Sequence, residues 1–73
     1  MKKAIFKKRL AKIQGAKTPE ILQGIINNLQ VQGFSTHAGT DYYAKDPEKV
    51  PVEFREEFLL GYAQQVLFYR FTA

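Results

Sequence analysis

The hydrophobic positions of the chain fall into three helical patterns that polar segments separate. In residues 3–14, apolar side chains recur at the i, i+4 and i+7 positions of a single helix face, at Phe6, Leu10 and Ile13. Basic residues fill the other faces, and Gly15 follows as a stop signal. The pattern predicts an amphipathic helix. It is expected to be weak on its own, because like charges close together on a helix repel, and to need docking on the rest of the chain.

The second pattern, over residues 18–32, carries the clearest start signal. Thr18 suits the N-cap position, because its hydroxyl can accept a hydrogen bond from a backbone N–H of the first turn. Pro19 suits the first helical position, where a missing N–H costs nothing. These signals predict a capped helix with one apolar face. The residues of that face are Leu22, Ile25, Ile26 and Leu29.

Two glycines mark special positions in this second helix. Gly24, in its middle, costs about 1 kcal/mol relative to alanine and is interpreted as a site of close helix contact. Gly33 is predicted to adopt the left-handed backbone conformation that ends a helix, with Phe34 folding back onto Leu29.

The third pattern predicts a long helix over residues 51–71. Pro51 suits its first position. Glu53, Glu56 and Glu57 lie near the start, where the positive end of the helix dipole favours acidic groups. The start of this helix is therefore well marked.

Aromatic and aliphatic residues cover two faces of this third helix. The first stripe is Phe54, Phe58, Tyr62, Val66 and Tyr69, and the second stripe is Leu60, Leu67 and Phe71. From Val66 onward nearly every position is apolar, so we expect this end of the helix to be buried on every side. A strand over residues 66–71 is the alternative, because β-forming residues are frequent there.

Residues 34–50 lack helical periodicity and predict a long polar loop between the second and third helices. Asp46, Pro47 and Glu48 could open one short helical turn within it. The predicted fold is a single all-α domain over residues 1–73 with three helices. The alternative is an α+β domain with a small hairpin at 31–44, whose strands would lie at 31–36 and 41–44 with a turn at 38–39.

Composition supports one globular domain and narrows the ways in which it can be stabilised. The chain has 73 residues, 45% of them hydrophobic and 25% charged, as in ordinary soluble domains. A domain of this size buries little surface, so it often needs a disulfide, a metal or a partner. With no cysteine and a single histidine, His37, disulfides, cysteine-based zinc sites and histidine-rich metal sites are excluded. Good packing of the core or binding to a protein partner remains as the source of stability.

The chain is expected to be cytoplasmic and to have no membrane partner. The apolar stretch that follows the first lysines, residues 4–6, is too short for a secretory signal. The longest apolar run, residues 58–63, is far below the roughly 20 residues that a membrane span needs. The absence of cysteine agrees with a reducing compartment.

Charge is distributed unevenly along the chain. Residues 1–17 contain seven basic residues and no acidic one, whereas residues 18–73 contain four basic and seven acidic residues. The charges of the two parts, +7 and −3, give the net charge of +4. Such a basic helix fits an acidic protein surface, nucleic-acid phosphates or solvent alone. The candidate electrostatic residues are Lys3, Lys7, Lys8, Arg9 and Lys12.

The sequence offers little support for catalysis. Ser35, His37 and Asp41 supply the residue types of a catalytic triad, but all lie in one predicted loop, whereas a triad needs members held by separate rigid elements. The GAKT segment at 15–18 lacks the first glycine of a phosphate-binding loop and fits a turn better. The three acidic residues at 53–57 are interpreted as a solvated helix start rather than a cation site. We predict no enzymatic activity, no cofactor and no metal site.

The predicted function is that of a small protein-interaction module, such as a regulator, adaptor or inhibitor of the kind that bacteria, phages and mobile elements encode. The third helix has more apolar surface than a three-helix core of this size needs, and aromatic residues are enriched in interfaces. Contact with a protein partner or a second copy is assigned to Leu60, Leu67, Phe68 and Phe71. The alternative is a nucleic-acid-binding protein that uses the basic first helix.

Overall fold

Three helices of 12 or 13 residues carry the fold in the computed structural model, which describes residues 2–35 and 40–72. They are α1 (Lys3–Gln14), α2 (Pro19–Val31) and α4 (Arg55–Leu67). Over these described residues there is no strand, so the all-α prediction is confirmed. No helix in the same part of the chain is both long enough and apolar enough to cross a membrane.

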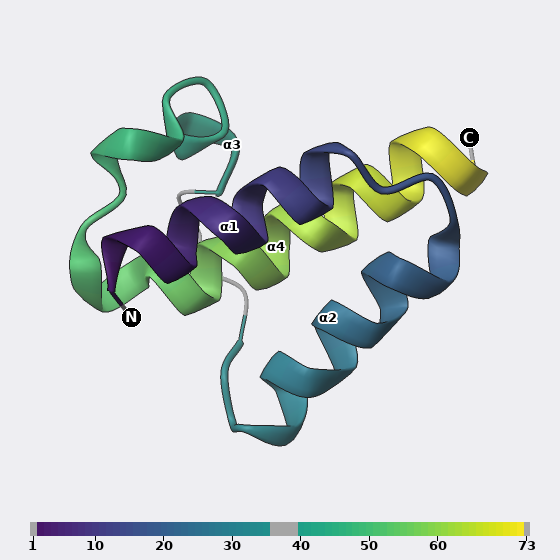
Figure 1. Cartoon of the computed structure of the whole chain (residues 1–73), viewed down its shortest axis with the longest axis horizontal. Helices are drawn as coiled ribbons and strands as arrows, with labels where there is room; N and C mark the ends of the chain where they lie inside the picture. The colour runs from purple at the N-terminus through teal and green to yellow at the C-terminus, as the bar shows by residue number, and fades with distance from the viewer. Residues whose placement is uncertain (1, 36–39, 73) are drawn as a thin grey trace.

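The central helix of the fold is α4, on which both α1 and α2 pack (Figure 1). In Figure 1, α1 and α4 run in the same direction and α2 runs in the opposite sense. The aromatic third helix is thus the element against which the other two helices fold. The buried core between these elements consists of Phe6, Ile13, Ala16, Leu22, Leu29, Val50, Phe58, Leu59, Leu60 and Ala63.

The apolar stripe predicted for the first helix is the face that α1 buries. Phe6 and Ile13 are buried, and Leu10 is half-buried against the core. The helix ends as predicted at Gly15, whose N–H donates a 2.9 Å hydrogen bond to the carbonyl of Ala11. Since the basic side chains cannot enter the core, they define the outer faces of α1.

The C-terminal end of α2 is closed by the glycine motif that the sequence predicts. Gly33 has a φ of 95°, the left-handed conformation that a side chain would strain. Its N–H donates to the carbonyl of Gln30 at 3.0 Å, and the N–H of Phe34 donates to the carbonyl of Leu29 at 3.1 Å. This pair of bonds is the Schellman arrangement, and Phe34 packs half-buried against the core. The predicted helix stop is confirmed.

Two expectations for α2 are wrong. Thr18 lies at the N-cap in an extended conformation, but its side chain makes no capping hydrogen bond. Gly24 is exposed, and a Cβ atom built there would meet no other atom within 4 Å, so this glycine does not permit a close helix contact. Its position instead leaves open space beside the helix.

The segment between α2 and α4 contains short helical turns. They are α3 (Thr40–Tyr43) and a 3₁₀ turn, η1 (Pro47–Lys49), which is the short turn predicted from Asp46 to Glu48. Residues 41–43, assigned to the second strand of the alternative hairpin, are helical instead, so that alternative is wrong there. The predicted turn at 38–39 lies outside the described residues. The N–H of Ala44 closes α3 on the carbonyl of Thr40 at 2.9 Å.

The long helix predicted over residues 51–71 is present, with irregular ends. A 3₁₀ turn, η2 (Val52–Phe54), precedes α4, so Pro51 stands before this turn rather than at the first α-helical position. After α4, the chain continues as a wider π-helical turn, η3 (Phe68–Thr72). The strand alternative for residues 66–71 is therefore wrong.

Candidate interaction site

Two adjacent aromatic side chains are exposed where α4 passes into η3. Phe68 is 59% exposed and Tyr69 is 72% exposed. Their rings meet edge to face with centroids 5.1 Å apart. We call Phe68 and Tyr69 the aromatic patch. Large neighbouring aromatics left in solvent are typical of a surface that another molecule covers.

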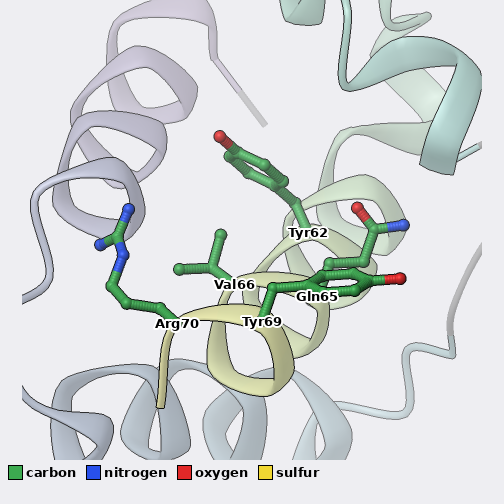
Figure 2. Close-up of a pocket in the computed structure, with 5 residues that line it drawn as sticks. All are labelled: Tyr62, Gln65, Val66, Tyr69 and Arg70. Carbon is green, nitrogen blue, oxygen red and sulfur yellow. The ribbon is translucent and has the colours of Figure 1, made fainter. Parts of the chain in front are cut away.

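Two hollows flank the aromatic patch. The first, of about 380 Å³, is lined by Tyr62, Gln65, Val66, Tyr69 and Arg70 (Figure 2). The second, of about 260 Å³, is lined by Thr40, Gly61, Gln64, Gln65, Phe68 and Tyr69. In Figure 2, Tyr69 and Gln65 point to one side of the helix while Tyr62 and Arg70 point to the other. Because Tyr69 and Gln65 line both hollows, these two side chains separate one from the other.

The first hollow is supported by a row of aromatic rings that begins in the core. Phe6 of α1 contacts Phe58 of α4 at a centroid distance of 6.2 Å, and Phe58 stacks on Tyr62 at 5.5 Å with 17° between the ring planes. Phe58 is buried, whereas Tyr62 is only half-buried and reaches the hollow. The wall that Tyr62 provides is therefore held in place by core packing.

A long-range hydrogen bond fixes the other wall of this hollow. Nη1 of Arg70 donates to the backbone carbonyl of Ala16 at 2.9 Å. Ala16 lies in the connection between α1 and α2 and is itself buried. The bond attaches η3 to that connection, so the aromatic patch sits on a turn with a fixed anchor.

The interaction residues predicted from the sequence do not form one surface. Leu60 is 1% exposed and belongs to the core, so its assignment as a contact residue is wrong. Leu67 and Phe71 are half-buried and pack against the core. Phe68 alone of the four is widely exposed. The physical reason is that α1, α2 and α3 all pack on α4, so the core they enclose takes in Leu60 and part of Leu67 and Phe71.

Tyr69 and Arg70 are site residues that the sequence did not reveal. Tyr69 continues the stripe of Tyr62 and Val66, which predicted a core position. Figure 1 shows η3, in yellow, extending past the end of α1 at Gln14, so α1 does not cover this turn. The expectation that the last turns are buried on every side is wrong for this reason.

The five candidate electrostatic residues share α1. Lys3, Lys8 and Lys12 are exposed and Arg9 is half-buried. Lys7 lies 3.6 Å from Glu48, with both side chains mostly in solvent, so this ion pair contributes little to stability. Since α1 contains no acidic residue, the helix presents a basic outer surface, as the sequence predicts.

The weaker chemical motifs do not assemble into a site in the described part of the chain. Ser35 is exposed, while His37 and the side chain of Asp41 lie outside the described residues. Within the described ranges, no three acidic, histidine or cysteine side chains gather to hold a metal, and this includes the acidic residues at 53–57. Residues 15–18 form the connection between α1 and α2.

Searches against protein-family models, curated proteins and solved structures find no match for this chain. No family is therefore shown. The aromatic patch, the hollows beside it and the charge on α1 are the features of the molecule that bear on its function.

Proposed function

We propose that the protein is a non-enzymatic interaction module that binds an acidic protein partner through the aromatic patch. The observation that carries this proposal is the exposure of Phe68 and Tyr69 next to each other, with a hollow on either side. Aromatic side chains in such settings supply much of the binding energy of interfaces. A partner would cover both rings and insert apolar side chains into the hollows.

The first hollow beside the patch is suited to binding because little of its wall has to be ordered. Tyr62 is stacked on the buried Phe58, and Arg70 is bonded to Ala16. A partner that docks on a surface already fixed loses less side-chain entropy than one that docks on mobile groups. Preorganisation of this kind raises affinity for a given contact area.

Charge favours an acidic partner over a second copy of the chain. The chain has a net charge of +4, and two copies that approach one another repel. The exposed lysines of α1 attract a negatively charged surface over a distance of about a Debye length, roughly 8–10 Å at moderate salt. They would raise the rate of association more than the final affinity.

The test compares Phe68→Ser/Tyr69→Ser with the control Val31→Ser, which changes a 79% exposed apolar residue at the end of α2. Each protein is immobilised and presented with lysate of the cells that produce it. We expect the wild type and the control to retain the same acidic protein, and the double variant to lose it more than about tenfold. Equal retention by the double variant would refute the proposal. A wild-type dimer in light scattering that the double variant abolishes would replace it with self-association.

Nucleic-acid binding is the second candidate, and the exposure of Lys3, Lys8 and Lys12 on one helix favours it. It predicts a gel shift of DNA or RNA that weakens steeply as salt increases. Lys8→Glu/Lys12→Glu should abolish that shift, whereas the change at the aromatic patch should leave it unaltered. The absence of a shift at low salt would eliminate this candidate.

A further inference from the structure

A groove lies between α1 and α2, away from the aromatic patch. Its volume is about 450 Å³, and its lining includes Arg9 and Lys12 from α1. From α2 it receives Ile21, Gly24, Ile25 and Leu29. Along their described lengths, α1 and α2 pack on α4 rather than extensively on each other. The groove therefore runs between two helices that both pack on α4 but diverge from one another.

The two walls of the groove differ in chemistry. Arg9 and Lys12 are three residues apart, so they occupy one face of α1 as neighbours on successive turns. Ile21 and Ile25 are four residues apart and share a face of α2 in the same way. One wall is cationic, and the facing wall is mainly apolar, with Asn28 and Glu20 as its polar residues. The lining has a single acidic residue, Glu20, at the start of α2.

Gly24 leaves the middle of the groove open. It is exposed, and a Cβ atom at this position would meet nothing within 4 Å. Glycine weakens a helix interior, and neither a turn nor a close contact within the described residues accounts for it here. Its absent side chain gives another backbone room to approach α2.

We infer that this groove is a binding site for an acidic amphipathic helix of a partner protein. The carboxylates of such a helix would pair with Arg9 and Lys12, and its apolar side chains would pack on Ile21 and Ile25, as amphipathic helices do in grooves. Charge complementarity selects this occupant, because the basic wall belongs to a segment with seven basic residues and no acidic one. The lining of this groove does not include Phe68 or Tyr69, so the failure of one proposal would not affect the other.

The test uses a fluorescent peptide of about 18 residues, long enough to form a helix, in which leucine follows helical spacing and glutamate fills the flanking positions. Fluorescence anisotropy measures its binding to the wild type. Gly24→Glu places a carboxylate inside the groove, while Gln23→Glu adds the same charge at an exposed neighbouring position outside its lining. Because glutamate and alanine favour helix more than glycine, Gly24→Glu and the neutral Gly24→Ala should fold. Circular dichroism verifies this for each variant.

We expect Gly24→Glu to weaken peptide binding more than about tenfold, because like charges would then face each other in the groove. Gln23→Glu should stay close to the wild type, because it lies outside the lining. Gly24→Ala should weaken binding by less than Gly24→Glu, because its methyl group takes up part of the space left for another backbone. Lys12→Gln should weaken binding as well. A scrambled peptide of the same composition should bind poorly. Equal weakening by Gly24→Glu and Gln23→Glu, or equal binding of the scrambled peptide, would overturn the inference. The inference would also be overturned if Gly24→Glu weakened the binding of a DNA duplex but left the binding of the peptide unchanged.

Discussion

Arg70 and Ala16 lie 54 residues apart in the chain and are joined by a 2.9 Å hydrogen bond from the guanidinium to the backbone carbonyl. Ala16 follows the end of α1, where no further helical turn supplies a donor for its carbonyl. The bond connects η3 to the corner between α1 and α2. It holds η3, and with it the aromatic patch, against the rest of the fold.

Replacing Arg70 by alanine should lower the free energy of unfolding by about 1–2 kcal/mol, because a hydrogen bond with a charged donor is lost. Arg70→Lys keeps the charge but lacks the planar guanidinium, so it should recover only part of this loss. Urea denaturation measures both variants. A stability of Arg70→Ala equal to that of the wild type would show that the bond contributes nothing.

Phe58→Ala should be the most damaging of the changes considered. Phe58 is 1% exposed and lies between Phe6 and Tyr62, so its removal leaves a cavity and breaks the row of rings. The expected cost of about 3–5 kcal/mol is comparable to the whole stability of a domain this small. Thermal denaturation followed by circular dichroism should show a largely unfolded chain at 37 °C. A cooperative transition close to that of the wild type would contradict the core assignment.

Gly24→Ala should stabilise the protein by about 0.5–1 kcal/mol. The new methyl group meets no neighbour within 4 Å, and alanine is the better helix former. Chemical denaturation should therefore show a higher midpoint with an unchanged slope. A destabilised variant would indicate that the space beside α2 is filled in solution.

Gly33→Ala should act in the opposite direction. The φ of 95° at this residue is costly for any side chain, by about 1–2 kcal/mol for alanine. Asparagine tolerates left-handed backbone better, so Gly33→Asn should lose less stability than Gly33→Ala. The two glycine series measured together separate helix propensity from backbone strain. Equal effects of alanine and asparagine at this position would contradict the strain explanation.

The features predicted correctly from the sequence depend on near neighbours. The end of α2 follows from Gly33 and Phe34, because the Schellman bonds connect residues within one turn. The buried face of α1 follows from the spacing of Phe6, Leu10 and Ile13. In both cases the deciding interactions lie within a few positions of the residue concerned.

The candidate site could be predicted only in part, because exposure depends on which element covers a residue. Leu60 and Phe68 are both apolar residues of the single helix that the sequence predicts, yet Leu60 is 1% exposed within α4 and Phe68 is 59% exposed in η3. Thr18 has the right residue type and an extended backbone, but its hydroxyl makes no capping bond. The bond from Arg70 to Ala16 spans most of the chain and leaves no local signal.

Because η3 is wound as a π-helix, the number of residues in this segment affects the direction in which its side chains point. A π-helical turn closes its hydrogen bonds over five residues, one more than an α-helical turn. Deleting one residue there would let the segment revert to α-helical winding, in which a turn needs one residue fewer, so the residues after the deletion would keep nearly the same direction around the helix axis. An additional residue before Arg70 cannot be absorbed in this way and would rotate the guanidinium by about 100°, away from Ala16. This turn should thus tolerate the loss of a single residue more readily than the gain of one.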